Sequence, residues 1–377
     1  MENSVNRNRV LPILAAVAVM LAIPAPAQAA PSIDHADTQA VLDRYQGGAG
    51  PGAAVHAGNR TGTWEVRAGT ADTNVQRPIS SDDQFRIGSQ TKTFTAIVVL
   101  QLADEGKIDL DAPIERYLPG VFNGTGYDGT TISMRQILQH TSGITDHLGT
   151  PAAGPDGTYS LRELVRAGLT NPPQFPPGTA WGYSSVNYLV AGLLIEQITG
   201  RSAGDAITSR IIGPLKLTRT TYPRPGDRQL ATPYLPGYIG GRTGPFFFWF
   251  ERTFAWELSQ WATAGAMAST EQDMVTFTQA LADGRLISPA TLAQMRTTVP
   301  IPGAPAGMAY GLGLIRFDLS CGRRAWGHIG DVATGHSSAT FATDDGRHAA
   351  LVTNAFVQIE DTTTRVQVID SALCGTP

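Results

Sequence analysis

Ser89 and Lys92 stand three residues apart in the stretch FRIGSQTKTFTA. A serine hydroxyl is a poor nucleophile at neutral pH and needs a base within hydrogen-bond reach. On a helix, side chains three or four residues apart lie on the same face. By composition alone a serine precedes a given lysine by three residues in roughly one case in fifteen. The pair therefore indicates, without proving, a serine nucleophile with a lysine base.

The pair requires a helix, and the sequence predicts one over residues 89–104. Its apolar residues are too many for a surface helix and are typical of a buried one. They include Phe94, Ile97, Val98, Leu100 and Leu102.

The rest of the chain favours an α+β fold. Its expected elements are a helix at 37–45, strands at 53–57 and 63–68 around the turn residues Gly58 and Asn59, helical patches at 133–139, 160–168 and 187–198, helices at 270–283 and 288–296, strands at 309–317, 325–328, 337–343 and 348–354, and a helix at 359–373. Strands at both ends with helices between them predict one antiparallel sheet built from both chain ends, flanked by helices and interrupted by an inserted all-helical subdomain.

The N-terminus has the pattern of a secretory signal peptide. Arg7 and Arg9 precede an apolar run from Val10 to Ile23, and small residues follow. Cleavage is expected after Ala29 or Ala30, because small residues precede such sites. The run is shorter than the roughly 20 residues that a membrane span needs. We therefore expect a secreted protein without membrane contact in its mature form, with residues 30–377 as a single catalytic domain. Its sheet part would comprise about 30–88 and 266–377, and its helical subdomain about 106–265.

Charge and cysteine content narrow the function classes. The formal net charge is −4 and basic residues do not cluster, so nucleic acid is not an expected partner. The seven histidines lack metal-ligand spacing, so neither a metal nor a cofactor is expected. The two cysteines, Cys321 and Cys374, predict one disulfide in an exported protein, which would tie the last helix to a strand.

Three separated segments carry a family resemblance: Ser89 to Lys92, Tyr183 to Ser185, and His328 to Gly330. They are similar to the three signature elements of the penicillin-recognising serine hydrolases, the serine β-lactamase and D-alanyl-D-alanine carboxypeptidase superfamily. The likeness continues through DEGKIDLDAPIERYLP, ILQHTSGI, PPGTAWGYSS, WATAGAMASTEQDM and YGLGL. Within this class the chain most resembles secreted actinobacterial D-alanyl-D-alanine carboxypeptidases.

The resemblance implies a role for each matching residue. Ser89 would form an acyl-enzyme, and Lys92 and Tyr183 would act as a coupled proton relay. Which of these two is the resting base stays open, because lowering either pKa to 7 costs about 4 to 5 kcal/mol. His328 would complete the proton network and Gly330 would leave room for substrate along the strand edge.

The same likeness implies the surroundings of the reaction. The backbone N–H groups of Ser89 and Asp331 would form the oxyanion hole. Tyr159 and Trp261 are candidate substrate-binding residues in the cleft wall, and His140 and Trp181 are expected to be structural. Implied ligands are a peptidoglycan stem peptide or a small ester or amide, with β-lactams as acylating agents, bound by a monomer.

Three positions depart from the family pattern. Ser185 stands where the third residue of Y-x-N is usually asparagine, and Asp331 and Ile315 stand where carboxypeptidases place a threonine and a carboxylate-binding arginine. Arg316 is one residue away and would point to the other face of its strand. Aspartate 4 Å from a substrate carboxylate would cost about 4 kcal/mol at an effective dielectric of 20. Unless another cation fills the gap, this predicts a leaving-group site shifted toward neutral or cationic amides or esters.

Several functions remain open. The first expectation is D-alanyl-D-alanine carboxypeptidase-like hydrolysis, and the alternatives are a β-lactamase, an esterase or amidase of the same fold, and a secreted penicillin-binding sensor with little turnover. The segment GHSSA approaches the nucleophile elbow of α/β-hydrolases. That reading is disfavoured because only His348 follows Ser337, with two aspartates crowded between them.

Overall fold

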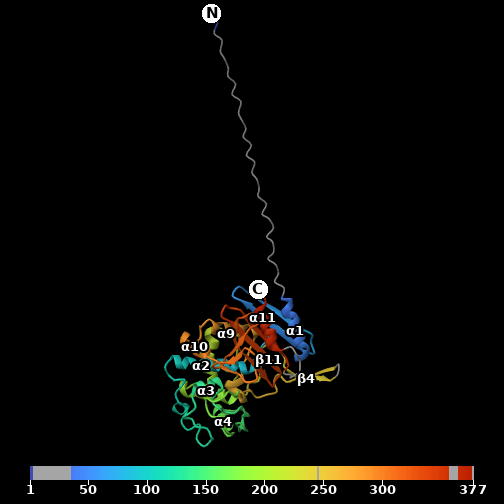
Figure 1. Ribbon diagram of the computed structural model, residues 1–377. Coiled ribbons are helices and arrows are strands. Elements are labelled where there is room, and N and C mark those ends of the chain that lie inside the picture. Colours follow the sequence, from blue (N-terminus) through green and yellow to red (C-terminus); the bar gives the residue numbers. More distant parts are fainter. Residues whose placement is uncertain (3–34, 244–245, 356–363, 376–377) are drawn as a thin grey trace. The chain divides into compact units, whose positions relative to one another are not determined.

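An antiparallel sheet of eight strands forms the centre of the fold, in the order β2-β1-β12-β11-β10-β9-β8-β7. The computed structural model describes residues 1–2, 35–243, 246–355 and 364–375. The strands are β1 (Gly52–Asn59), β2 (Gly62–Gly69), β7 (Val299–Pro300), β8 (Met308–Tyr310), β9 (Ile315–Asp318), β10 (Arg324–Val332), β11 (His336–Thr343) and β12 (His348–Thr353). Because β1 pairs with β12, strands from distant parts of the chain lie side by side (Figure 1).

Each face of the sheet packs against a different set of helices. Along β1, Ala53, Val55 and Ala57 belong to an apolar cluster with α1 (Ala36–Ala49) and α11 (Arg365–Cys374). Ala54, between them, belongs to a larger cluster with the remaining helices. Successive side chains of a strand point to opposite faces, so this alternation makes the sheet the middle layer of the fold.

The larger cluster surrounds α2 (Thr91–Asp104), whose residues are all buried except Gln101, Ala103 and Asp104. It packs against α5 (Ser185–Thr199) and α8 (Ala262–Gly265). The other helices are α3 (Met134–Gln139), α4 (Leu161–Gly168), α6 (Ala203–Ile207), α7 (Gly213–Leu215), α9 (Glu271–Ala282) and α10 (Pro289–Met295), with single-turn segments at Gly88–Gln90, Ile114–Arg116, Thr208–Ile212 and Leu258–Gln260. Two small sheets pair β3 (Phe85–Arg86) with β6 (Ala268–Ser269) and β4 (Tyr238–Thr243) with β5 (Phe246–Glu251).

The predicted fold class is confirmed, and one predicted turn is wrong. The turn between β1 and β2 lies at Arg60 and Thr61, not at Gly58 and Asn59, which belong to β1. Asn59 pairs with Gly62. Its side-chain oxygen accepts hydrogen bonds from the backbone N–H (2.8 Å) and hydroxyl (2.6 Å) of Thr61. This local bonding closes the turn two residues later than the sequence predicted.

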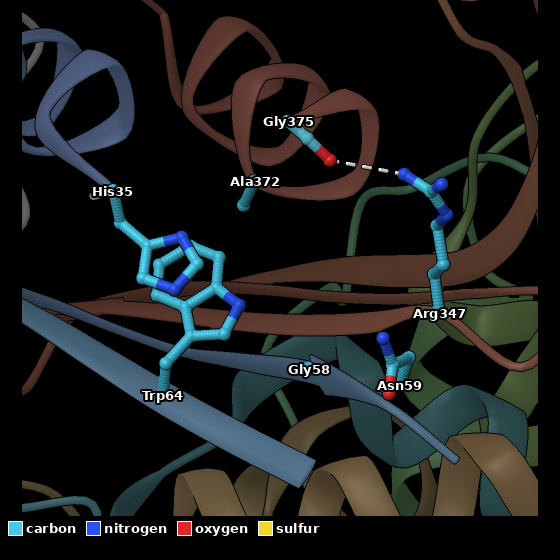
Figure 2. A pocket seen from close by; sticks show the side chains of 7 residues that line it. All are labelled: His35, Gly58, Asn59, Trp64, Arg347, Ala372 and Gly375. Atoms are coloured by element: carbon cyan, nitrogen blue, oxygen red, sulfur yellow. Dashed lines mark hydrogen bonds between the residues drawn. The ribbon is translucent and has the colours of Figure 1, made fainter. Parts of the chain in front are cut away.

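A small cavity lies where the start of α1, strands β1 and β2, and the end of α11 meet (Figure 2). The His35 ring stacks on Trp64 with centroids 3.8 Å apart. The Arg347 guanidinium donates to the carbonyls of Leu373 at 2.9 Å and Gly375 at 3.0 Å. None of these residues belongs to the candidate site described below. These contacts hold the start of α1 and the end of α11 against the sheet.

The predicted disulfide between Cys321 and Cys374 is present. It joins the end of α11 to the turn between β9 and β10, whereas the sequence predicted a link to a strand. Residues 3–29 of the predicted signal peptide and residues 359–363 of the predicted last helix lie outside the described residues. In the described part, no helix is both long and apolar enough to cross a bilayer.

Candidate active site

Ser89 lies in the single turn that leads into α2. Its side chain is partly exposed, while Gly88 and Gln90 on either side are buried. Gly88 has φ +54°, and a Cβ there would lie 2.6 Å from the Asp331 carbonyl oxygen. The glycine therefore lets the nucleophile turn approach β10 closely. The start of α2 also brings its positive dipole end to Ser89, which favours negative charge developing there.

Lys92 is buried beside Ser89. Its Nζ lies 3.1 Å from Ser89 Oγ, 2.8 Å from the Ala264 carbonyl oxygen and 3.5 Å from Ser185 Oγ. Burial lowers the Lys92 pKa to about 7, against a small opposing effect of Asp146. A neutral amine can donate its two protons to Ala264 and Ser185 and accept the Ser89 proton on its lone pair. The geometry is that of a base poised at neutral pH.

Tyr183 approaches Ser89 from the start of α5. Its hydroxyl donates to Ser89 Oγ at 2.8 Å, and Lys92 Nζ lies 4.9 Å from the centre of its ring. Burial, followed by the effect of Tyr310, raises the Tyr183 pKa well above its usual value. The phenol therefore keeps its proton at neutral pH. The choice between two bases that the sequence left open now favours Lys92, with Tyr183 as a proton donor.

Ser185 is the first residue of α5 and faces the same amine. Its backbone N–H donates to Asp146 Oδ1, and the preceding Ser184 caps the helix by accepting from Asn187 N–H. The Ser185 hydroxyl touches Lys92 only at 3.5 Å. It thus supplies at most a weak contact.

His328 is buried on β10 and is neutral. Burial lowers its pKa to about 3. Its Nδ1 lies 2.6 Å from the Ile329 carbonyl oxygen and its Nε2 lies 3.0 Å from the Tyr310 hydroxyl. A neutral ring with a proton on Nδ1 accepts the tyrosine proton on Nε2. These bonds direct His328 toward Tyr310.

Tyr310 was not among the candidate residues, although it begins the YGLGL segment that carries part of the resemblance. It lies beside His140, with ring centroids 4.8 Å apart, and His140 lies 4.5 Å from the Tyr183 ring. His140 is fully buried, and its Nδ1 is 3.2 Å from both Ser184 N and Asn187 Nδ2. An aromatic cluster thus connects His328 to Tyr183 through Tyr310 and His140.

Gly330 and Asp331 bring β10 against the nucleophile turn. A Cβ on Gly330 would lie 2.0 Å from the Ile87 carbonyl oxygen, so only glycine fits there. Asp331 pairs with Arg365 of α11 through two hydrogen bonds of 2.7 Å. It also accepts from the Ser337 hydroxyl at 2.5 Å.

The Asp331 carboxylate is neutralised by a cation within the fold. The cation that neutralises it comes from Arg365, 34 residues further along the chain, which no local pattern indicated. Ile315 is buried, and Arg316 contacts Thr298 at 3.3 Å and Asp318 at 3.3 Å. The repulsion expected from a bare aspartate is therefore reduced, but the nearby guanidinium is already occupied.

The two candidate wall residues occupy different surroundings. Trp261 immediately precedes α8, whose Ala264 carbonyl binds Lys92. Tyr159 lines a cavity with Glu196 and Tyr222 that Ser89, Lys92 and Tyr183 do not line.

The structure brings Ser89, Lys92, Tyr183 and Ser185 together, and His328 is connected to them indirectly, through the aromatic cluster. Tyr159 is not part of that constellation.

Comparisons with known proteins give a family match over most of the chain. The family described as Beta-lactamase matches residues 38–373. The putative penicillin-binding protein PbpX of Bacillus subtilis is 29% identical over 243 residues, 61% of this chain and 52% of PbpX, so the match spans about half of that relative.

Two solved structures are similar over almost the whole fold. A D-stereospecific amidohydrolase from Streptomyces sp. is 37% identical with a TM-score of 0.78, covering 91% of this chain and 100% of that one. The D-amino acid amidase of Ochrobactrum anthropi SV3, complexed with L-phenylalanine amide, is 27% identical with a TM-score of 0.76, covering 90% and 97%.

Proposed function

Since the chain belongs to the Beta-lactamase family of penicillin-recognising serine hydrolases, we propose that it hydrolyses amides of D-amino acids through an acyl-enzyme on Ser89. One observation carries the mechanism: the buried Lys92 amine, with a pKa of about 7, lies 3.1 Å from Ser89 Oγ. A base works best when its pKa is near the working pH.

The reaction follows from the contacts of these residues. Lys92 takes the Ser89 proton as the oxygen attacks the carbonyl carbon, and the N–H groups of Ser89 and Asp331 receive the negative charge. The Tyr183 hydroxyl protonates the leaving nitrogen, and the Lys92 ammonium supplies the proton that restores the phenol. Water then cleaves the acyl-enzyme with Lys92 again as the base, which releases the acid and regenerates Ser89.

The substrate class rests on the leaving-group side, where the family resemblance, and no contact with Ser89, places Asp331. A carboxypeptidase substrate brings a terminal carboxylate, which needs a free cation. Arg365, the guanidinium beside Asp331, already donates to both oxygens of that aspartate. Binding a second carboxylate there would require breaking charge-assisted hydrogen bonds. A small neutral leaving group such as ammonia imposes no such cost. The names of the two similar structures, an amidohydrolase and an amidase acting on D-amino acid compounds, support this choice.

Hydrolysis of D-phenylalanine amide by purified protein tests the proposal, with L-phenylalanine amide and diacetyl-Lys-D-Ala-D-Ala alongside. We expect ammonia release from the D-amide, at least tenfold slower release from the L-amide, and loss of at least 1,000-fold in Ser89→Ala. Intact mass after incubation with benzylpenicillin should show a penicilloyl adduct in wild type only. An adduct without amide hydrolysis would keep the nucleophile and overturn the substrate. Amide hydrolysis undiminished in Ser89→Ala would overturn the mechanism.

A second candidate is D-alanyl-D-alanine carboxypeptidase activity, which would need the Arg365 guanidinium to leave Asp331 and bind the substrate carboxylate. In Asp331→Thr the guanidinium would be free to bind a carboxylate. We expect D-alanine release from the tripeptide to rise at least tenfold in Asp331→Thr and to return to the wild-type rate in Asp331→Thr/Arg365→Gln. A wild type that already releases D-alanine faster than ammonia would make this second candidate the main function.

Export of the protein, with cleavage after Ala29 or Ala30, is part of the proposal. The Cys321–Cys374 disulfide supports it, because such bonds persist outside the reducing cytosol. The intact mass of the protein recovered from the culture medium of its own host tests it. A mass that retains residues 1–29 would overturn it.

A further inference from the structure

The β4–β5 hairpin is a ribbon of aromatic side chains. Exposed fractions reach 75% for Phe246, 48% for Phe247, 46% for Phe248 and 62% for Phe250. Within the described residues, only Met1 and Val75 are other large hydrophobic residues with such exposure. Figure 1 shows the hairpin, labelled β4, standing out from the rest of the fold. Neither its aromatic run nor its strands take part in the candidate active site.

Aromatic side chains lie on both faces of the ribbon. Phe248 and Phe250 lie on one face with ring centroids 6.2 Å apart, and Phe247 stacks with Trp249 on the other at 6.1 Å. Opposite Trp249 and Phe248, β4 carries Gly240 and Gly241. These two glycines have no side chains to cover the Trp249 and Phe248 rings. The aromatic surface is therefore presented to both sides.

The base of the ribbon is fixed. Tyr238 is buried, its backbone N–H donates to the Asn354 carbonyl at 2.8 Å, and its hydroxyl accepts from Thr73 N–H at 3.2 Å. The Arg252 N–H donates to the Gly237 carbonyl at 2.7 Å at the other strand's end. A ribbon fixed at its base holds its aromatic residues in a defined orientation relative to the body.

A second copy of this chain is a poor fit for this surface. One face of a two-stranded ribbon of six residues per strand measures on the order of 200 Å², from strand rise and spacing. A stable dimer buries roughly 800 Å² per partner. A partner packed on one face would also leave the opposite aromatic ladder exposed. A fluid apolar phase covers both faces at once.

We propose that the β4–β5 hairpin inserts into the interfacial region of a lipid bilayer. Phenylalanine and tryptophan are suited to that region, where apolar rings meet polar headgroups. Arg242 and Glu251 are the charged residues of the sequence from 238 to 251, and their charges cancel, so insertion would be driven by the aromatic rings rather than by the charge of the lipid surface. From the sequence, no membrane contact is expected in the mature form. Insertion of the hairpin would be such a contact, and it does not depend on the proposed reaction.

Flotation with vesicles tests the inference. Wild type is mixed with vesicles of equal phosphatidylglycerol and phosphatidylcholine, beside Phe246→Ser/Phe248→Ser/Phe250→Ser and the control Val75→Ser, whose residue is also exposed but lies outside the hairpin. We expect wild type and the control to float and the triple variant to partition at least tenfold less. Circular dichroism and the rate of acylation by penicillin, unchanged in the triple variant, would show that it folds.

Three results would overturn the inference. Wild type that stays with the aqueous fraction, or a triple variant that floats as well as wild type, would remove the hairpin from any role in lipid binding. The third such result would come from sedimentation of the protein without vesicles. If wild type self-associates while the triple variant is monomeric, and lipid does not compete, the hairpin joins two copies of the chain.

Discussion

Burial keeps the Lys92 amine neutral near pH 7, which makes it available as a base, and at the same time it lowers the stability of the fold. The Lys92 amine lies within hydrogen-bond distance of the Ser89 and Ser185 hydroxyls and of the Ala264 carbonyl oxygen. None of these three partners is a carboxylate. The pKa falls because the charged form loses water without gaining an ion pair. Tyr183 is buried in the same region, and its pKa is raised instead of lowered, so the phenol stays protonated. The same low-polarity surroundings therefore create a base and an acid on either side of one serine.

The first prediction concerns activity against pH. Only neutral Lys92 can accept the serine proton, so the acylation rate should fall as pH drops through about 7, by tenfold per unit. His328, with a pKa of about 3, does not titrate in this range. Stopped-flow acylation by a fluorescent penicillin from pH 5 to 9 measures it, because the penicillin carboxylate stays ionised throughout. A rate independent of pH from 6 to 8, or a midpoint near 10, would contradict Lys92 as the base.

The second prediction concerns stability. Lys92 has a folded-state pKa of about 7 against 10.5 when exposed, so folding must release a proton between these pH values. The unfolded state binds more protons there, and stability rises with pH through that window. The penalty at pH 7 is about 5 kcal/mol at most. Urea unfolding should show Lys92→Met more stable than wild type at pH 7, with the difference shrinking by pH 10. The exposed Lys107→Met should show no such trend, and a less stable Lys92→Met at pH 7 would refute the argument.

At this scale the sequence predicted the site in part. Ser89, Lys92 and Tyr183 were found because a short spacing and two motifs carry them, and the structure brings them within hydrogen-bond distance. The pairing of Asp331 with Arg365 was not predicted. It joins a strand to a helix through tertiary packing, and nothing in the residues around either position encodes the partner.

Among the elements, α2 is the one on which the site depends, and glycines with positive φ flank it. Gly88 precedes the helix and Gly106 follows it, with φ of +54° and +70°. Their surroundings differ. A Cβ on Gly88 would meet the Asp331 carbonyl at 2.6 Å, whereas nothing lies within 4 Å of one on Gly106. Gly88 and Gly106 both have a left-handed backbone conformation, but only Gly88 lies close to β10.

The third prediction uses this pair. Gly88→Ala and Gly106→Ala should each lose about 1 kcal/mol from the left-handed backbone. Only Gly88→Ala should also slow acylation, by at least 100-fold, because it pushes the oxyanion strand away from Ser89. Thermal unfolding and penicillin acylation measure both effects. Equal acylation rates in the two variants would mean that the close approach of Gly88 to β10 has no catalytic importance.

Element prediction succeeded where a periodic pattern was present. The buried helix α2 and strands β1, β11 and β12 follow apolar patterns and were expected close to their observed bounds. The β4–β5 hairpin was not expected. Its first strand contains Gly240 and Gly241, and its second, FFFWFE, has no alternation of apolar and polar residues. Alternation arises when one face is buried, and this ribbon exposes both.

For the whole molecule, α11 links the C-terminal part of the chain to the site. It packs on β1, β11 and β12. Arg365 at its start holds Asp331, and Cys374 at its end is bonded to Cys321. The sequence predicted the disulfide and the shared sheet, but not that the same helix would provide the partner of Asp331.

The last prediction separates these two ends of α11. The Cys321–Cys374 bond spans 53 residues, and its loss should reduce the free energy of unfolding by about 4 kcal/mol in the chain-entropy model. Because Arg365 remains paired, the double variant Cys321→Ser/Cys374→Ser should acylate within twofold of wild type at 25 °C. Urea unfolding and penicillin acylation measure the two quantities. Unchanged stability would mean that packing alone holds α11, and a large loss of acylation would mean that the bond at its end is needed to position Asp331.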